Sequence, residues 1–262
     1  MHNAAFAALG LNWRYLAFEV DPKHLRAAIE GARAMHFAGL NLTVPHKLLA
    51  VDMVDELDIS AQTWGAVNTI QFIPDAAGKV RAVGYNTDAD GLTNSLRADL
   101  AVELRGAKVL LLGAGGAGRT AALKLAAEKV AELFLLNRTA SKAEAIAAEI
   151  SKQFPAVKVS TGYPEAEVDL VLNATSLGLK PADGSPLDEN QFSLKQAHAV
   201  YDMIYQPAET KLLAAAKAAG CKTANGIGML VQQGAKAFEI WTGQPAPVAV
   251  MRRAVEGSVY GV

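Results

Sequence analysis

The sequence lacks the features of several large protein classes. Its one cysteine, Cys221, excludes an internal disulfide and a cysteine-based metal site. No apolar run is long enough to span a membrane, and the N-terminus lacks the pattern of a secretory signal. The five histidines do not have the spacing of a metal site, so we expect no bound metal. These absences predict a soluble, cytoplasmic protein without a membrane partner.

An excess of charge of one sign is also missing. The 25 basic and 26 acidic residues leave a net charge of -1, and the sequence contains no basic block. Nucleic acid is therefore not an expected partner. Apolar residues make up 51% of the 262 positions, which is enough for one large or two modest cores. No coiled-coil heptad is present, and a monomer and a homodimer both stay open.

Strand-like and helix-like segments alternate along the chain, which predicts a parallel α/β architecture. The expected strands cover residues 39–44, 67–73, 79–83, 108–112, 132–136, 168–172 and 199–203. The expected helices cover residues 4–9, 22–35, a short segment from Pro45, and residues 88–100, 141–154, 208–219, 228–242 and 247–256. A turn at residues 75–78 separates the second and third strands.

A glycine-rich turn is the most informative motif. An apolar strand pattern ends at Leu112, a G-x-G-x-x-G turn follows, and an Ala-rich helical pattern begins. In this context Gly113 permits the tight turn, Gly115 lets a pyrophosphate approach the backbone, and Gly118 lets the helix pack closely. The free N–H groups of the helix N-terminus favour an anion. The motif predicts a dinucleotide site formed by Gly113, Ala114, Gly115, Gly116, Ala117 and Gly118.

The end of the next strand indicates which dinucleotide binds. Sites for NAD usually place an acidic residue there, about 20 residues after the turn, to accept from the ribose 2′-hydroxyl. This strand ends instead in Asn137, Arg138 and Thr139, and Lys142 follows one helical turn later. A 2′-phosphate favours such positive charge and a planar bidentate donor. We therefore expect NADP as the cofactor.

Polar clusters occur at four further segment ends, at residues 41–47, 66–69, 84–88 and 226–233. Polar groups at strand ends are typical of the ligand crevice of an α/β protein. Each cluster alone is explained equally well by a turn or a helix cap, as for Asn86 and Asp88.

Together these segments resemble shikimate dehydrogenase over nearly the whole chain, through NLTVPHK, AVNT, NTD, GAGGAG, NRT, NATS, YDMIY and GMLVQQ. The resemblance implies reversible, NADPH-dependent reduction of 3-dehydroshikimate to shikimate, a step in aromatic amino-acid biosynthesis. It also implies two domains: a substrate-binding and catalytic domain (1–88 plus 226–262) and an inserted, doubly wound Rossmann-type NADP domain (89–225).

The resemblance carries roles to individual residues. Lys47 and Asp88 are the implied catalytic pair, because a lysine can exchange the hydroxyl proton that accompanies hydride transfer. The implied substrate-binding residues are Asn41, Thr43, Asn68, Thr87, Tyr205 and Gln233. Beyond the glycine turn and the second strand end, the implied cofactor contacts are Thr175, Ser176, Met203, Gly226 and Met229. Both methionines are equally compatible with core filling.

One departure from the family concerns the N-terminus. The family begins with a strand and a Ser-x-Ser-Pro segment that binds the substrate carboxylate, whereas this sequence begins at Met1-His2. There are three explanations: the start was placed too far downstream, the chain was trimmed, or the segment was truly lost. The first two are favoured. If the chain is complete, we expect a damaged substrate domain with poor carboxylate affinity and an NADP domain that still binds.

Three alternatives stay open on sequence alone. A quinate/shikimate dehydrogenase shares the motifs, although the Asn137-Arg138-Thr139 segment argues against its frequent preference for NAD. Methylenetetrahydrofolate dehydrogenase and glutamyl-tRNA reductase share the two-domain architecture but match the NLTVPHK and NTD segments less well. A non-catalytic NADP-binding homologue is supported only by the missing N-terminal segment.

Overall fold

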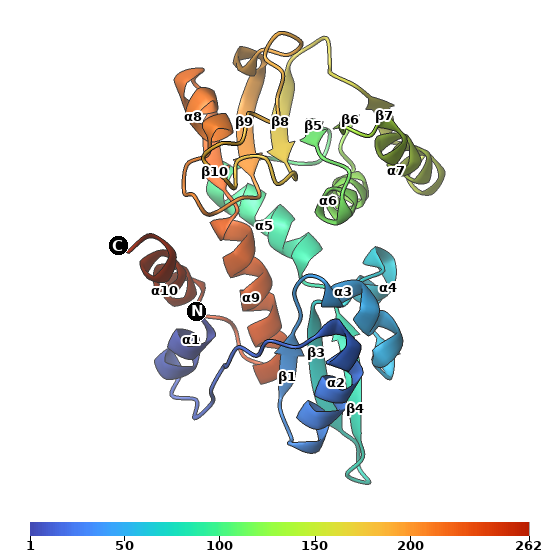
Figure 1. Cartoon of the computed structure of the whole chain (residues 1–262), viewed down its shortest axis with the longest axis vertical. Coiled ribbons are helices and arrows are strands. Elements are labelled where there is room, and N and C mark those ends of the chain that lie inside the picture. Colours follow the sequence, from blue (N-terminus) through green and yellow to red (C-terminus); the bar gives the residue numbers. More distant parts are fainter. Residues whose placement is uncertain (262) are drawn as a thin grey trace. The chain divides into compact units, whose positions relative to one another are not determined.

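The computed structural model describes residues 1–261, which form two compact units (Figure 1). Of the described residues, unit 1 contains 1–91 and 231–254, and unit 2 contains 92–230 and 255–261. Both units are therefore assembled from segments that are distant in the sequence. The predicted domain boundaries follow residue 88 and precede residue 226, whereas the units divide after Gly91 and before Val231.

Unit 1 is built around a four-stranded sheet with the order β1-β3-β4-β2. Its strands are β1 (Gly39–Asn41), β2 (Glu56–Leu57), β3 (Thr69–Pro74) and β4 (Val80–Tyr85). The β1–β3 and β3–β4 pairs are antiparallel, and the β2–β4 pair is parallel. The predicted turn at residues 75–78 folds β3 and β4 into an antiparallel hairpin, so the sheet of this unit is mixed and not parallel throughout.

The helices of unit 1 come from both ends of the chain. They are α1 (His2–Ala8), α2 (Leu25–Ala34), α3 (His46–Leu49) and α4 (Ile59–Trp64), with the short 3-10 turns η1 (Pro22–His24) and η2 (Ala50–Met53). Helix α2 packs Leu25 and Ile29 against Ile70 and Phe72 of β3, and it lies along the sheet in Figure 1. The apolar side chains of α2 and β3 thus form the core of this unit.

The C-terminal part of α9 (Ile227–Thr242) completes unit 1. Trp241 Nε1 donates to the Ile70 carbonyl oxygen at 2.9 Å, and Phe238 stacks on Phe6 of α1 with ring centroids 5.4 Å apart. Gly39 has no side chain here, because a Cβ atom would lie 2.1 Å from Trp241 Nε1. This close approach fixes the end of α9 against strands β1 and β3.

Unit 2 contains a six-stranded parallel sheet with the order β10-β9-β8-β5-β6-β7. Its strands are β5 (Lys108–Leu112), β6 (Glu132–Leu136), β7 (Lys158–Thr161), β8 (Val168–Asn173), β9 (Ala197–Asp202) and β10 (Lys222–Asn225). The chain builds outward from β5 through β6 and β7, then returns to β8 and builds in the opposite direction. The switch between β5 and β8 is where ligands bind in open α/β sheets.

Helices cover the sheet of unit 2. They are α6 (Gly116–Ala127), α7 (Ala140–Gln153) and α8 (Lys211–Ala218), with the 3-10 turn η3 (Leu194–Gln196). Helix α7 packs beside β6 and β7, and α8 packs beside β9 and β10 (Figure 1). The core is formed by fully buried strand residues such as Leu110 and Val200 together with Leu212 of α8. The predicted Rossmann-type arrangement is therefore present.

Helix α5 (Asp88–Leu100), α9 and α10 (Val248–Tyr260) each contribute residues to both units. Helix α5 has the bounds expected from the sequence. Among the described residues, no helix combines the length and the apolar character that a membrane span requires.

Candidate active site

Unit 1 brings the two predicted catalytic residues together. Lys47 lies on the short helix α3, and Asp88 is the first residue of α5. Lys47 Nζ lies 2.8 Å from Asp88 Oδ2, and the two side chains are 28% and 18% exposed. A partly buried pair of this geometry is less screened by water than a surface ion pair. The structure therefore holds an ammonium group and a carboxylate at one position, accessible to a small molecule.

Asn68 holds the second oxygen of Asp88 and, through Thr87, the turn that precedes it. Asn68 Nδ2 donates to Asp88 Oδ1 at 2.9 Å and to Thr87 Oγ1 at 2.9 Å. Asn68 Oδ1 accepts from the Thr87 backbone N–H at 2.9 Å. Both side chains are 2% exposed. Because both Asp88 oxygens accept hydrogen bonds, the position of the carboxylate is fixed from two sides.

Asn41 joins the same cluster from β1. Its Nδ2 donates to Thr69 Oγ1 at 3.0 Å, and its Oδ1 accepts from the Tyr15 hydroxyl at 3.0 Å. Thr43 is exposed on the segment between β1 and α3. Gln233 lies on α9 against Gly91, where a Cβ atom at Gly91 would be 2.8 Å from Gln233 Cβ. Unit 1 thus contains all of the predicted substrate-binding residues except Tyr205.

The glycine turn of unit 2 has the local geometry that its sequence requires. Gly113 has φ +108°, which favours glycine, and a Cβ atom at Gly118 would lie 2.0 Å from the Gly113 carbonyl oxygen. Gly115 precedes the first residue of α6, Gly116, and a Cβ at either position would have no atom within 4 Å. The N-terminus of α6 is therefore packed tightly at Gly118 and open at Gly115 and Gly116.

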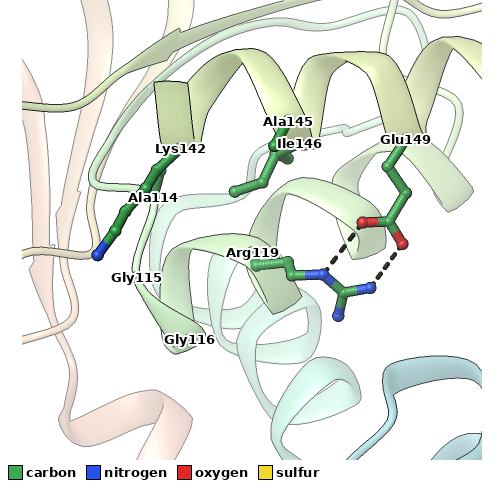
Figure 2. A pocket seen from close by; sticks show the side chains of 8 residues that line it. All are labelled: Ala114, Gly115, Gly116, Arg119, Lys142, Ala145, Ile146 and Glu149. Carbon is green, nitrogen blue, oxygen red and sulfur yellow. Dashed lines mark hydrogen bonds and ion pairs between the residues drawn. The ribbon is translucent and has the colours of Figure 1, made fainter. Parts of the chain in front are cut away.

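A cavity of about 350 Å³ opens beside this turn, between α6 and α7 (Figure 2). Its lining residues are Ala114, Gly115, Gly116, Arg119, Lys142, Ala145, Ile146 and Glu149. Arg119 donates from Nε and Nη2 to the two Glu149 oxygens, at 3.1 and 2.5 Å. Figure 2 shows Lys142 extended along the Ala114–Gly115 turn and away from that ion pair. Since Glu149 neutralises Arg119, Lys142 is the lining cation placed to attract an anion.

The end of β6 supports the glycine turn. Asn137 Oδ1 accepts from the Ala114 backbone N–H at 3.0 Å, and Asn137 Nδ2 donates to the Thr139 carbonyl oxygen at 2.9 Å. The Asn137 side chain therefore holds two backbone segments together. Arg138 and Thr139 are exposed, and Thr139 occupies the N-cap position of α7 without a side-chain capping bond.

A buried polar network shapes the loop after β8. Asn173 Oδ1 accepts from the Thr175 N–H at 2.9 Å and its hydroxyl at 2.8 Å, and Asn173 Nδ2 donates to Asp202 Oδ1 at 2.9 Å. Asp202 also accepts from the Ile204 N–H and the Thr210 hydroxyl. Burial raises the pKa of Asp202, and these hydrogen bonds oppose that effect. Thr175 is thereby fixed against Gly113, at the switch between β5 and β8.

The remaining predicted residues of unit 2 follow strands β8, β9 and β10 or, for Met229, lie in the first turn of α9. Ser176 and Tyr205 are exposed, and the Tyr205 carbonyl oxygen accepts from the Tyr260 hydroxyl at 2.9 Å. A Cβ atom at Gly226 would lie 2.0 Å from the Met203 carbonyl oxygen, so these two segments are in close contact. The Met229 N–H, in the first turn of α9, donates to the Tyr201 hydroxyl at 3.2 Å. Tyr205 belongs to a different unit from the other predicted substrate-binding residues.

Three segments of the chain match described protein families. Residues 1–70 match the shikimate dehydrogenase substrate binding domain, residues 95–179 match shikimate / quinate 5-dehydrogenase, and residues 226–256 match the shikimate 5'-dehydrogenase C-terminal domain. A relative from Methanopyrus kandleri, named shikimate dehydrogenase (NADP(+)), is 42% identical over 97% of this chain and 89% of its own. The chain belongs to the shikimate dehydrogenase family.

Solved structures agree with this membership. A Thermus thermophilus shikimate 5-dehydrogenase, solved with NADP(H) and shikimate, is 36% identical with a TM-score of 0.83, covering 97% of this chain and 92% of that one. A ligand-free 5-ketofructose reductase from a Gluconobacter strain is also 36% identical, with a TM-score of 0.85, and covers 98% of this chain and 91% of that one. The predicted family and fold class are confirmed. At the level of the family, so are the predictions of an oxidoreductase and of NADP as its cofactor.

Two members of the cluster around Asp88 were not predicted from the shikimate dehydrogenase motifs. Thr69 lies between Asn41 and Asn68, and Tyr15 bonds to the far side of Asn41. Thr69 follows Asn68 in the AVNT segment, which is a signal that sequence reasoning could have used. Tyr15 lies in an irregular segment and carries no comparable signal. Within residues 1–261, no group of three or more His, Cys, Asp or Glu side chains is placed to hold a metal ion.

Proposed function

We propose that this chain catalyses the reversible, NADPH-dependent reduction of 3-dehydroshikimate to shikimate. The observation that carries the proposal is the Lys47–Asp88 pair, with Nζ 2.8 Å from Oδ2, in a member of the shikimate dehydrogenase family. The Thermus thermophilus relative, which was solved with NADP(H) and shikimate, supports the choice of both ligands.

Lys47 is the proposed proton donor and acceptor. Reduction of a ketone requires a hydride at the carbonyl carbon and a proton at the oxygen. NADPH supplies the hydride when it is bound. The Lys47 ammonium group gives its proton to the developing alkoxide, and the neutral amine takes the hydroxyl proton in the reverse direction. Asp88 keeps Nζ in place, and its oxygens have further lone pairs to accept from a substrate hydroxyl.

The substrate hydroxyls are assigned to the polar groups around this pair. Short amides and hydroxyls suit a polyol ring because they can donate and accept. Asn68 and Thr87 are buried and bonded to each other, and Asn68 holds Asp88, so the cluster presents an oriented carboxylate as well as its own polar atoms. The other proposed contacts are Asn41, Thr43 and Gln233 of unit 1 and Tyr205 of unit 2.

The residues of unit 2 fit a dinucleotide phosphate. Gly115 and Gly116 leave the start of α6 open, and a helix N-terminus with exposed N–H groups favours phosphate oxygens. Arg138, at the end of β6, and Lys142, which lines the cavity, are the proposed partners of the 2′-phosphate. The other proposed contacts are Gly113, Ala114, Ala117, Gly118, Asn137, Thr139, Thr175, Ser176, Met203, Gly226 and Met229.

This assignment gives each part of the chain a role. Residues 1–88 plus 226–262 form the proposed substrate-binding and catalytic domain, and residues 89–225 form the proposed NADP domain. Support comes from the family descriptions and from the distribution of the candidate residues, since Lys47 and Asp88 lie in unit 1 and the glycine turn lies in unit 2.

Substitution of Lys47 tests the proposal. We expect Lys47→Met to lower kcat for shikimate oxidation with NADP about 100-fold or more, because the hydroxyl proton loses its acceptor. KM for NADP and binding of NADPH should stay unchanged, since unit 2 is untouched. Lys79→Met, at an exposed position of unit 1, is the matched control. Near-normal kcat in Lys47→Met would contradict the acid–base assignment.

The identity of the substrate is tested in a separate experiment. One structural relative is a 5-ketofructose reductase, so the fold alone does not determine which carbonyl is reduced. The wild-type protein should be assayed with shikimate, quinate and 5-ketofructose, each with NADP(H) and NAD(H). The proposal requires shikimate with NADP to have the highest kcat/KM. If NADPH binds but no substrate reacts, the chain is a non-catalytic NADP-binding protein.

A further inference from the structure

A continuous chain of hydrogen bonds runs through the cluster in unit 1, and a residue without an assigned role stands near its centre. In order, its members are Tyr15, Asn41, Thr69, Asn68, Asp88 and Lys47. The Thr69 hydroxyl accepts from Asn41 Nδ2 at 3.0 Å and donates to Asn68 Oδ1 at 3.0 Å. Thr69 is fully buried, so bulk water cannot replace either bond.

The backbone places Thr69 between the two amides. Asn41 of β1 is the antiparallel register partner of Thr69 in β3, so their side chains are cross-strand neighbours. Asn68 directly precedes Thr69 in the chain, and its carbonyl oxygen also accepts from Asn41 Nδ2, at 3.3 Å. The single hydroxyl of Thr69 thus contacts one amide from the neighbouring strand and one from the residue that precedes it.

Partners that can only donate or only accept set which way each amide faces: the Thr87 N–H and the Asp88 carboxylate for Asn68, and the Asn68 carbonyl oxygen for Asn41. The Thr69 hydroxyl, which both donates and accepts, bonds to each amide in that orientation. Asn68 Oδ1 accepts from Thr69 and from the Thr87 N–H, which leaves Asn68 Nδ2 directed at Asp88. Asn41 Nδ2 donates to Thr69, which leaves Asn41 Oδ1 directed at Tyr15. A reversed amide at either asparagine would place two donors or two acceptors against each other.

We propose that Thr69 is a positioning residue, which fixes the amides of Asn41 and Asn68 and, through Asn68, the carboxylate of Asp88. The inference rests on the proposed function, in which these side chains bind the substrate and orient Lys47. Thr69 acts through its neighbours and is not itself assigned a contact with the substrate.

Replacement of the hydroxyl by a methyl group tests this role. We expect Thr69→Val to lower kcat/KM for shikimate about tenfold, because Asn68 Oδ1 loses a donor and Asn41 Nδ2 loses an acceptor. KM for NADP and the affinity for NADPH should stay unchanged. Thr69→Ser keeps the hydroxyl and should recover most of the activity. The matched control is Thr63→Val, since the Thr63 hydroxyl bonds only within α4, to the Ile59 carbonyl oxygen.

A double-mutant cycle separates positioning from a general loss of stability. In a chain that already carries Asn41→Ala and Asn68→Ala, Thr69→Val should cause no further loss of kcat/KM, because no amide remains to be positioned. A purely structural role would give the same fractional loss in both backgrounds. Urea unfolding of each variant confirms that the proteins are folded under the assay conditions.

The outcomes distinguish this inference from the proposed function. A wild-type protein without shikimate turnover would refute the proposed function before Thr69 is considered. An active wild-type protein with equally active Thr69→Val would refute the positioning role alone. Additive losses in the cycle, or a Thr69→Ser variant as impaired as Thr69→Val, would also overturn it.

Discussion

His2 makes the stability of unit 1 dependent on pH. Its imidazole is 3% exposed, and neither ring nitrogen has a hydrogen-bond partner within residues 1–261. The ring stacks on Tyr15 at a centroid distance of 4.5 Å and lies 5.4 Å from Trp241. Burial lowers the pKa of His2 from 6.5 to about 4, and repulsion from the amino terminus contributes in the same direction. The folded state therefore requires a neutral imidazole.

The direction in which pH changes the stability of unit 1 follows from the protons that His2 binds in the folded and unfolded states. Well above pH 6.5 His2 is neutral in both states, and its ionisation has no effect on stability. As the pH falls from 6.5 towards 4, the unfolded chain binds a proton that the folded chain excludes, so the free energy of unfolding decreases. The difference between the two pKa values corresponds to about 3 kcal/mol in total. About 2 kcal/mol of this loss is present at pH 5.

The assay compares wild type with His2→Phe, which keeps an aromatic ring but cannot titrate. All three tryptophans, Trp13, Trp64 and Trp241, belong to unit 1, so tryptophan fluorescence in urea reports on that unit. Between pH 8 and pH 5 we expect wild type to lose about 2 kcal/mol more than His2→Phe. His24→Gln, at an exposed position, should behave as wild type. Equal losses in wild type and His2→Phe would refute the reasoning.

Two further predictions concern the cofactor. Arg138→Leu should raise KM for NADP about tenfold and leave KM for NAD unchanged, because only NADP carries the 2′-phosphate. Steady-state kinetics with both cofactors measures the two KM values. Equal changes in KM for NADP and NAD would contradict the prediction. Gly118→Ala should destabilise the protein by about 3 kcal/mol and abolish NADPH binding, because its Cβ would lie 2.0 Å from the Gly113 carbonyl oxygen. Thermal unfolding measures this loss, and Gly116→Ala, whose Cβ meets no atom within 4 Å, should keep the wild-type melting temperature.

Sequence patterns predicted the buried elements well and the exposed ones poorly. The central strands β5 and β6 have the expected bounds, because continuous apolar runs mark them clearly. The edge strands β7 and β10 were not predicted, since their mostly exposed or half-buried residues show no apolar run. The expected buried strand at residues 39–44 is wrong in extent. It ends at Asn41, is only half-buried, and leads to Pro45, which has no N–H for a sheet.

The candidate site was also predicted only in part, because local motifs can be recognised from the sequence and contacts between separate elements cannot. The glycine turn is a local motif, so its geometry could be predicted from spacing alone. The Lys47–Asp88 pair joins residues on separate elements, and only the family resemblance indicated it. Thr69 begins a strand, where threonine is common for packing reasons, so its contact with Asn41 could not be recognised before the register of β1 and β3 was known.

The discontinuity of unit 1 has a consequence for the order of events during synthesis. The ribosome delivers residues 1–91 first, but Trp241 and Phe238, which complete the core beside Ile70 and Phe6, are translated only after residues 92–230. Domains generally fold as they emerge, N-terminal part first. Here the main segment of unit 2 has been translated in full while residues 1–91 of unit 1 still lack the C-terminal part of α9. The nascent chain must therefore keep the apolar surface of residues 1–91 from aggregating until α9 arrives.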